Sequence, residues 1–235
     1  MPVIPQIAPE IIARHPDFHA ASLTIRGAAI AAPESPELAA LLAQAEASLE
    51  ADDPVREAHL LAWDAPYRGF GAKPNRTLPS ATALLKRSRK DGALPRISPL
   101  VDAYNAVSVL HGIPVGGEDL ALYQGAPRLV IAEGSEPFDT VQNGEAVVET
   151  PEAGEVVWRD DHGVTCRRWN WRQGRRTMIT EASRDLWLVL EALGPMPAGR
   201  LAEAAGQLAG VIAALCPEAV IERHRLDATG FQPLA

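Results

Sequence analysis

The sequence predicts an α+β fold, a single compact domain in which mixed or antiparallel sheets are flanked by helices. Its 235 residues are 47% hydrophobic and 22% charged, which is enough apolar content for a sizeable core. Helical and extended patterns follow one another in mixed order, without the regular βαβ repeat of a parallel doubly wound sheet. No internal repeat is visible, so we expect residues 1–235 to form one domain.

The chain starts with a strand pattern that is followed by helical patterns. FHAASLTIRGAAIAA (18–32) alternates apolar and polar side chains in its first half and predicts a buried strand. Residues 36–51 carry leucine and alanine at three- and four-residue spacing, which predicts a helix with Ser35 as its N-cap. Another helix is expected over about 54–64, ending near Pro66.

Two more helices are predicted after a glycine- and proline-rich loop at 67–79. Ser80 can cap the first of them, whose last turn is the basic run KRSRK. ISPLVDAYNAVSVLHGIP (97–114) has the clearest helical pattern, with serine and proline at its start and glycine at its end. Asp102 and Asn105 do not fit its apolar stripe, so each is either solvated or hydrogen-bonded to a neighbouring loop.

Short extended runs punctuated by glycine occupy about 116–170. EVVWRD and VTCRRWNW flank the turn DDHG (160–163) and predict a hairpin. If the second strand continues to its last tryptophan, both tryptophans lie on one face, and Arg168, Asn170 and Arg172 lie on the other.

The last part of the chain reads as two helices and a strand. ITEASRDLWLVLEALGP (179–195) predicts a helix capped by Thr180 and closed by Gly194. RLAEAAGQLAGVIAALCP (200–217) predicts an alanine-rich buried helix, and AVIERHRL (219–226) predicts a final strand.

Charge and cysteine content exclude several classes of protein. The net charge of −8 and the sequence pI near 5.3 argue against a general nucleic-acid coat, because non-specific affinity comes largely from neutralised phosphates. The two cysteines, Cys166 and Cys216, lie far apart and in no CxxC motif, so neither a disulfide framework nor a zinc site is indicated. We expect a reduced, cytoplasmic setting.

Targeting and membrane segments are not indicated either. The N-terminal residues lack a basic start followed by an apolar core, and no stretch approaches the ~20 apolar residues that span a bilayer. We therefore expect no membrane partner.

Common catalytic motifs are absent from the sequence. It contains no GxxxxGK[ST], GxGxxG, HExxH or GxSxG motif, and no two of its six histidines are spaced like a metal pair. Asp160 and Asp161 precede a glycine, where acidic residues are usually turn formers. We therefore predict no metal and no cofactor.

Basic residues gather in two short runs despite the acidic balance. RRWNWRQGRR (167–176) has five arginines and two tryptophans in ten positions, and KRSRK occupies 86–90. Guanidinium groups bind phosphate bidentately and indole rings stack on bases, so the first run suits a phosphate and base platform. Each run also has a structural interpretation: the tryptophans can be core scaffolding, and KRSRK can complement a helix dipole.

The segment PVGGEDL (114–120) is the other notable constellation. Gly116 and Gly117 permit a close approach of the backbone to a ligand or to another strand. Glu118 follows directly and is the best available acid for positioning a water, although an exposed loop carboxylate is an equally good interpretation.

Several spaced blocks of the chain resemble a known family. LPRISPLVDAYNAVSVLHGIPVGGEDL, RLVIAEGSEPFDTV and RRTMITEASRDLWLVLEAL are similar to successive segments of the tRNA-binding B3/B4 domain of the bacterial phenylalanyl-tRNA synthetase beta subunit. The resemblance extends over about 90–193, and the first block and CRRWNWRQGRRT are closer still to free-standing B3/B4 proteins. The matching residues of the first block are Pro99, Val101, Asp102, Asn105, Gly112, Pro114 and Asp119.

This resemblance implies a stand-alone tRNA-binding or trans-editing module, because the synthetase domain hydrolyses tyrosine wrongly attached to the phenylalanine tRNA. The pocket histidine of the family falls on Gly116, and residues 171–174 replace its glycine-rich loop. The acidic residue that recognises the tyrosine hydroxyl falls near Arg175 or Arg176, and a cation cannot accept that hydrogen bond. A carboxyl- or phosphate-bearing ligand suits these arginines better.

The leading hypothesis is therefore a tRNA-binding protein, and hydrolysis of a misacylated ester, with Glu118 positioning the water, is left open as an additional activity. Its alternatives are a non-catalytic binder of an amino acid or other small carboxylate and a protein-interaction module. The expected substrate-binding residues are Asn105, Gly116, Gly117, Asn170, Trp171, Arg172 and Thr177. The expected RNA-binding residues are Lys86, Arg87, Arg89, Lys90, Arg168, Arg175 and Arg176. A continuous positive face joining the two basic runs would favour RNA, and internally paired arginines would oppose it.

Overall fold

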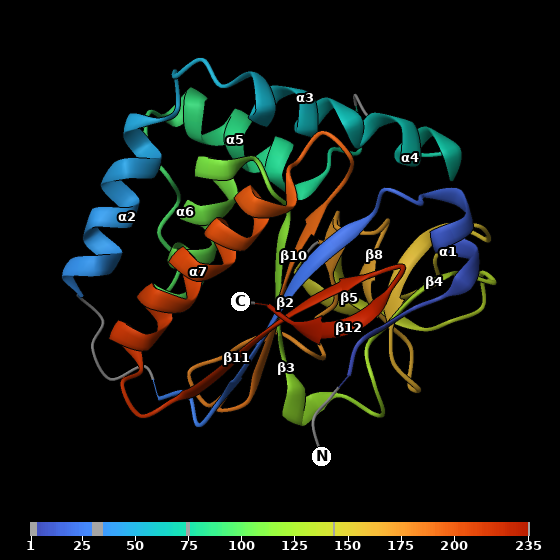
Figure 1. Ribbon diagram of the computed structural model, residues 1–235. Coiled ribbons are helices and arrows are strands. Elements are labelled where there is room, and N and C mark those ends of the chain that lie inside the picture. The colour runs from blue at the N-terminus through green and yellow to red at the C-terminus, as the bar shows by residue number, and fades with distance from the viewer. Residues whose placement is uncertain (1–3, 30–34, 74–75, 143, 235) are drawn as a thin grey trace.

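The computed structural model confirms an α+β fold in which two sheets pack against each other and helices cover one of them (Figure 1). It describes residues 4–29, 35–73, 76–142 and 144–234. The predicted strand over 18–32 and the predicted loop over 67–79 each extend partly outside these residues, at 30–32 and at 74–75.

The helices and strands follow in mixed order along the chain. The helices are α1 (Pro9–Arg14), α2 (Pro36–Ala47), α3 (Pro54–Ala62), α4 (Asp64–Gly69), α5 (Ser80–Asp91), α6 (Pro99–His111) and α7 (Ala198–Leu215). The strands are β1 (Gln6–Ile7), β2 (His19–Arg26), β3 (Val115–Asp119), β4 (Arg128–Ile131), β5 (Phe138–Gln142), β6 (Glu145–Glu149), β7 (Val156–Arg159), β8 (Val164–Arg167), β9 (Arg172–Gln173), β10 (Leu186–Ala192), β11 (Val220–Asp227) and β12 (Gly230–Pro233).

The central sheet has the strand order β12-β11-β2-β10-β3 and is antiparallel throughout. The second sheet has the order β1-β4-β7-β8-β9, in which the pair β1 and β4 is parallel and the others are antiparallel. Strands β5 and β6 form a separate hairpin. The sheets are thus mixed and antiparallel, as predicted.

The central sheet separates two hydrophobic cores. Helices α2, α6 and α7 cover one of its faces, where Leu23, Leu188 and Leu208 are fully buried (Figure 1). Its other face packs against the second sheet through aromatic side chains, including Trp158 and Trp187. Because a sheet buried on both faces favours apolar side chains on each, all residues of β10 are buried and Glu191 is its single charged residue.

Local signals predicted most of the other elements correctly. The Ser35 side chain accepts a hydrogen bond from Leu38 N at 3.0 Å and caps α2 as expected. The β7–β8 hairpin is present, whereas the Ser80 and Ser98 side chains form no capping hydrogen bond. Asp102 is buried, and its Oδ1 accepts from Ile97 N at 2.7 Å.

The predicted helix at 179–195 is wrong. Residues Leu186–Ala192 form β10, in the middle of the central sheet between β2 and β3, and residues 180–183 form a hydrogen-bonded turn before it. A run that is apolar apart from Glu191 satisfies a helical period as well as the pattern of a strand buried on both faces. The partner strands decide between the two, and the local sequence does not.

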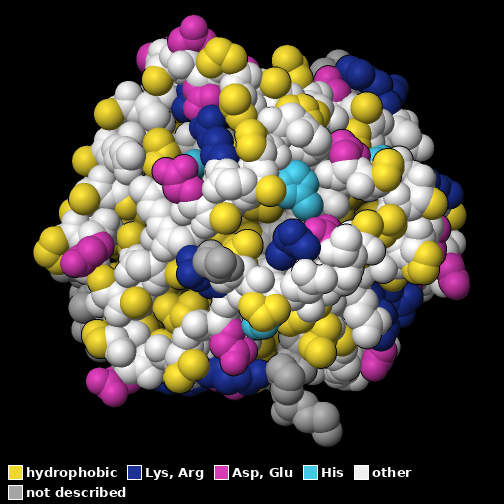
Figure 2. Space-filling model, in the orientation of Figure 1, with side chains coloured by type: hydrophobic (Ala, Val, Ile, Leu, Met, Phe, Trp, Pro, Cys, Tyr) yellow, Lys and Arg dark blue, Asp and Glu magenta, His cyan; other side chains and the backbone are white. Residues whose placement is uncertain are grey.

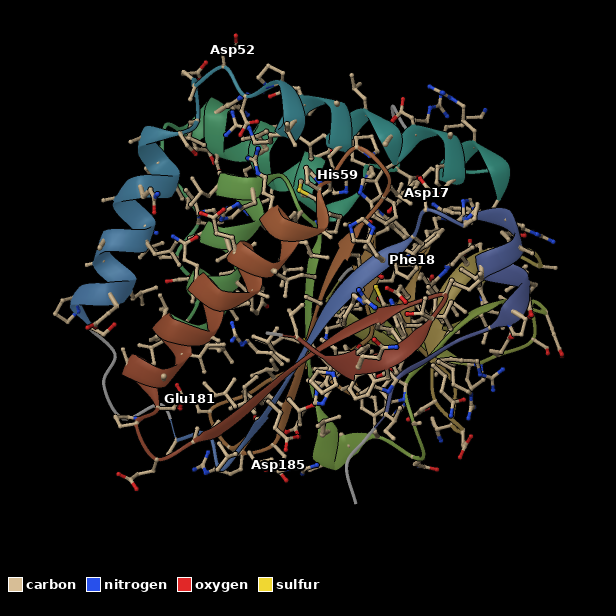
Figure 3. All side chains as sticks on the ribbon, viewed as in Figure 1. Asp17, Phe18, Asp52, His59, Glu181 and Asp185 are labelled. Atoms are coloured by element: carbon tan, nitrogen blue, oxygen red, sulfur yellow. The ribbon has the colours of Figure 1, made fainter. Side chains whose placement is uncertain are left out.

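The predicted continuation of the second hairpin strand through Trp171 is also wrong. Strand β8 ends at Arg167, and the next two residues have positive φ, 49° for Arg168 and 65° for Trp169. This left-handed turn directs Trp169 into the core between the sheets, where it is fully buried beside Phe18, labelled in Figure 3, at a ring distance of 5.1 Å. The two tryptophans therefore do not share a strand face.

His59 connects three elements through hydrogen bonds of its ring. It lies on α3 (Figure 3), with Nδ1 2.7 Å from the Gly112 carbonyl oxygen, and its Nε2 accepts from Leu193 N at 3.1 Å. Burial lowers its pKa to about 4 and its bond to Gly112 acts the other way, so the ring is neutral at pH 7. The contacts join α3 to the ends of α6 and β10.

Candidate functional site

A pocket of about 180 Å³ lies between the central sheet and the second sheet. At ~30 Å³ for each molecule it has room for about six waters, which suits an amino-acid-sized group rather than a drug-sized ligand. It is lined by Ser80, Tyr104, Val115, Gly116, Gly117, Glu118, Trp158, Cys166, Trp169, Asn170, Trp171, Arg172, Gln173, Trp187, Val189 and Glu191. We call it the inter-sheet pocket.

The floor of the inter-sheet pocket is the β3–β10 pair. Glu118 lies opposite Trp187 and Gly116 lies opposite Val189 in register, so these side chains share one face of the sheet. Glu191 follows on the same face of β10, about 13 Å along the strand from the level of Glu118. The pocket is therefore a slot with a glutamate at each end and glycine between them.

The two glycines serve different faces of β3. A Cβ on Gly116 would meet only Val189 Cγ1, at 3.5 Å, so the missing side chain leaves space in the pocket. A Cβ on Gly117 would lie 2.7 Å from Leu188 Cδ2 and 3.0 Å from Ile179 Cδ1, on the helical side of the sheet. Gly117 is thus required by packing, and Gly116 by the pocket.

We expect Gly117→Ala to lower the free energy of unfolding by about 1–3 kcal/mol, because overpacking forces the neighbouring side chains to shift. Gly116→Ala is the matched control and should change that free energy little, since its new methyl group makes only an ordinary contact. Urea unfolding of both variants measures the difference. Equal stability of the two variants would contradict the assignment of the two glycines to opposite faces.

Both glutamates at the ends of the slot are buried without a basic partner. Glu118 is 4% exposed and Glu191 is 1% exposed, and no Lys, Arg or His among the described residues forms an ion pair with either. Burial raises the pKa of each carboxyl to about 8. The hydrogen bond from Thr177 acts to lower the pKa of Glu118, and the hydrogen bond from Trp158 acts to lower that of Glu191.

Aromatic side chains form the walls of the pocket. Four of the five tryptophans of the chain line it, and Tyr104 joins them from α6. Trp158 and Trp187 pack edge to face at 5.0 Å, and Trp158 Nε1 donates to Glu191 Oε1 at 2.8 Å. The buried indoles exclude water around the carboxyls, which is why burial dominates the pKa values.

Three buried polar atoms of the pocket have no hydrogen-bond partner among the described residues. They are Glu118 Oε2, Asn170 Nδ2 and Trp169 Nε1. The other oxygen of Glu118 accepts from Thr177 Oγ1 at 3.1 Å, and Asn170 Oδ1 accepts from Tyr67 at 2.9 Å. An unpaired buried polar atom is costly, so three around one cavity indicate a ligand that completes them.

The turn after β8 brings the tryptophans and Asn170 to the pocket and is held by charged groups. Glu155 is 1% exposed and accepts from Arg167 Nη2 at 2.7 Å and from Arg168 Nε at 3.1 Å. Arg168 also donates to Thr77 and lies over the Trp171 ring at 4.6 Å. These contacts stabilise the left-handed turn that orients the pocket residues.

The structure brings most of the expected substrate residues together. Six of the expected residues line the inter-sheet pocket, namely Gly116, Gly117, Glu118, Asn170, Trp171 and Arg172. Thr177 stands behind Glu118 as its hydrogen-bond donor. Asn105 lies on α6 but does not line the pocket, where its neighbour Tyr104 is found instead.

The expected positive face is largely neutralised by internal ion pairs. Arg168 pairs with Glu155, and Arg176 pairs through two bonds with the fully buried Asp160, so both arginines have structural roles. In the other run, Arg87 pairs with Asp91 and Arg89 with Glu57. The four acidic partners, which the sequence could not assign, are Glu155, Asp160, Asp91 and Glu57.

Some basic side chains remain available. Lys86, Lys90, Arg172 and Arg175 are exposed and form no ion pair among the described residues. On the face shown in Figure 2, Lys and Arg side chains are interspersed with acidic and hydrophobic ones and form no continuous basic surface. An open hollow of about 730 Å³ lies along α5 and includes Lys73, Lys86 and Arg89 in its lining.

Sequence reasoning missed Glu191, Trp158 and Trp187 as pocket residues. Two of them lie in the segment that was predicted to be a helix, and their common face exists only in the strand β10. The usable signal was the alternation of Trp187, Val189 and Glu191, which is the period of a strand.

The described residues contain neither a metal-binding cluster nor a membrane-spanning helix. Within the described ranges, no group of three or more His, Cys, Asp and Glu residues could hold a metal ion. Over those residues, too, the helices lack the combination of length and apolar character needed to cross a bilayer.

Comparison with known proteins identifies the family. No curated protein matches the chain. Among solved structures, the chain is similar to an N-terminal fragment of the phenylalanyl-tRNA synthetase beta-subunit from Pyrococcus horikoshii, with a TM-score of 0.46 and 9% sequence identity over 94% of this chain and 50% of that one. The chain thus spans about half the length of that fragment. Residues 62–206 match the model of the B3/4 domain, and this match covers more than half of the sequence, so the chain belongs to the B3/4 domain family.

Proposed function

We propose that this protein binds the aminoacyl end of a tRNA in the inter-sheet pocket and hydrolyses its ester bond. The observation that carries this proposal is the set of three unpartnered polar atoms, Glu118 Oε2, Asn170 Nδ2 and Trp169 Nε1, around one small cavity. An acceptor with an ionisable proton and two N–H donors are the groups that a water and an acyl carbonyl require. The association of the B3/4 domain family with tRNA supports the choice of ester.

Glu118 is the general base of the proposed reaction. Its ionised carboxylate takes a proton from a water, and the hydroxide oxygen forms a bond with the acyl carbon. The tetrahedral intermediate then collapses, the bond to the ribose oxygen breaks, and Glu118 returns its proton to that oxygen. No side-chain nucleophile is needed, in keeping with the absence of a GxSxG motif.

The hollow along α5 gives the RNA backbone a path to the pocket. Ser80, the first residue of α5, lines the inter-sheet pocket, and Lys86 lines the hollow one and a half turns further along the helix. Lys73 is exposed on the same hollow. Phosphate groups lying there would meet these two lysines, whose charges no acidic side chain among the described residues neutralises.

Replacing Lys73 and Lys86 by alanine together is expected to weaken tRNA binding at every sequence and to reduce the slope of log K against log salt by about 2. Filter binding over a series of salt concentrations gives this slope. Arg87→Ala is the control, because Arg87 is paired with Asp91 on the same helix. An unchanged slope in the double variant would exclude this hollow as the RNA path.

The internal ion pairs favour a second candidate function. Because Arg168, Arg176, Arg87 and Arg89 all have acidic partners, less positive charge is free for RNA than the sequence suggests. A pocket that binds a free amino acid without hydrolysing anything needs none of this charge. The two candidates share the same pocket and differ in whether a tRNA carries the ligand.

A panel of correctly and incorrectly aminoacylated tRNAs tests the proposal. Release of the amino acid is followed for the wild-type protein and for Glu118→Gln and Arg172→Ala, with Glu222→Gln on the exposed face of β11 as the control. Selective release that Glu118→Gln loses and Glu222→Gln keeps would support a hydrolase. Tight binding of a free amino acid, with no release and no tRNA affinity, would favour the second candidate and refute the first.

A further inference from the structure

The Glu191 end of the inter-sheet pocket holds a buried carboxyl that forms no ion pair within the described chain. This carboxyl is 1% exposed and accepts from Trp158 Nε1 at 2.8 Å. Asn170 and Trp169 also favour its ionised form and act against the pKa increase caused by burial. Burial outweighs these contacts and raises the pKa to about 8, so the carboxyl is mostly protonated in the free protein at pH 7 and a bound cation would ionise it.

The walls beside this carboxyl favour a cation as well. Four indole rings line the pocket, and the face of an indole attracts ammonium and guanidinium groups more strongly than other aromatic side chains do. Trp171 already shows this chemistry at the mouth, where the Arg168 and Arg172 guanidinium groups lie 4.6 and 5.5 Å from its ring centre. The exposed Arg172 leaves the interior of the slot without a basic side chain.

The geometry points to a ligand that carries an alkylammonium or guanidinium group, with Glu191 as its counter-ion and the aromatic walls of the pocket around it. This inference rests on the pocket of the proposed function and adds the chemical class of its ligand. It replaces the carboxylate that the arginine run of the sequence favours, because Arg168 and Arg176 are neutralised by Glu155 and Asp160 outside the slot. The spacing of the two glutamates places the cation at one end of the ligand and the scissile ester at the Glu118 end.

The cation has two sources in an aminoacyl group, and they place the ester differently. One source is the α-ammonium group, which is bonded to the carbon next to the acyl carbon, so it reaches Glu191 only if the ester lies well away from Glu118. The other is the end of a basic side chain, which can lie at the Glu191 end while the ester lies at the Glu118 end. The shared chemistry is a positively charged nitrogen, and a comparison of probes with and without each nitrogen separates the sources.

Binding of small amines tests the inference without RNA and without a chemical reaction. The intrinsic tryptophan fluorescence is titrated with n-butylammonium and with n-butanol, which has the same length and no charge. We expect n-butylammonium to bind at least 10-fold more tightly, Glu191→Gln to remove the preference, and Glu222→Gln to retain it. Equal affinity for the two probes, or a preference for n-butanol, would overturn the inference.

Glu191→Gln keeps the shape and hydrogen-bonding capacity of a neutral carboxyl, so we expect it to fold, and thermal unfolding checks this. A second comparison uses the methyl esters of L-lysine and L-norleucine, with N-acetyl-norleucine methyl ester as the uncharged reference. Tighter binding of the lysine ester supports the side-chain source, and equal binding of both esters above the reference supports the α-ammonium source. Binding of neither ester above the reference overturns the inference.

The outcome is independent of the proposed hydrolysis. If n-butylammonium binds through Glu191 and no aminoacyl-tRNA is hydrolysed, the proposed function fails and the cation site remains. If aminoacyl-tRNA is hydrolysed and the amines show no preference over their neutral counterparts, the cation site fails and the proposed function remains.

Discussion

Glu118→Gln is expected to reduce kcat/KM for ester hydrolysis by about 100-fold or more, because glutamine cannot accept the proton of the attacking water. In the wild-type protein, burial raises the pKa of Glu118 to about 8, so only about a tenth of the free protein carries the reactive carboxylate at pH 7. The rate of hydrolysis should therefore rise from pH 6 to about pH 8 and approach a plateau at pH 9. Rates of amino-acid release across this range give the profile.

The groups around Glu118 make the profile specific to this carboxyl. Thr177 donates to it, and Arg176 and Asp160 lie behind it as an ion pair in which the pKa of Asp160 is lowered. Glu222→Gln is the control, since it removes an exposed carboxyl on β11, outside the pocket, and leaves Glu118 in place. A rise of the same size with pH in Glu118→Gln would show that another group is the base.

The double substitution Glu118→Gln and Glu191→Gln is expected to stabilise the fold at alkaline pH. Burial raises the pKa of both carboxyls to about 8, so the folded protein keeps two protons that the unfolded chain releases above about pH 4.5. Stability therefore falls as pH rises, by about 2 kcal/mol for each carboxyl between pH 6 and pH 8. The double variant has neither carboxyl, so it keeps the stability that the wild type loses as pH rises.

Urea unfolding at pH 6, 7, 8 and 9 gives the free energy of unfolding of the wild type and of the double variant. The effect is the difference between these two free energies. Subtraction is needed because His15 and His111 also have lowered pKa values through burial, and their contribution cancels between the two proteins. We expect the difference to grow in favour of the variant by about 4 kcal/mol from pH 6 to pH 8 and to level off above pH 8. A difference that does not change with pH would mean that neither carboxyl is protonated in the fold.

Such a gain in stability would indicate that the two buried carboxyls destabilise the free protein and are kept for ligand binding. Two carboxyls without counter-ions in an aromatic cavity destabilise the free protein, and a cationic ligand would remove part of this cost. The inferred cation site and the pH dependence therefore arise from the same arrangement of Glu118, Glu191 and the four indoles.

Half of the candidate site could be predicted from local sequence. Paired glycines before an acid indicated that Gly116, Gly117 and Glu118 approach a ligand or a strand, and in the structure Gly116 faces the pocket while Gly117 faces a packed core. The other half depended on β10. A run that is apolar apart from one glutamate fits a helix or a doubly buried strand, so the common face of Trp187 and Glu191 could not be recognised.

The arginine run shows the same limit for electrostatics. Five arginines in ten positions predicted a positive platform, yet Arg167 and Arg168 bind Glu155 and Arg176 binds Asp160. The sequence shows the number of charges, and ion pairing depends on which side chains the fold brings within about 4 Å. Glu155 lies twelve residues before Arg167, across the hairpin.

The sequence by itself determined the α+β class, the capped helix α2, the β7–β8 hairpin and, through its spaced blocks, the B3/4 family. These features rest on local patterns, which act between residues close in the chain. Only the tertiary structure decided that 186–192 is a strand, that the turn at 168–169 is left-handed, and that two glutamates end one aromatic slot. Each of these depends on contacts between distant segments, because strand pairing, burial and loss of solvent are properties of the packed chain.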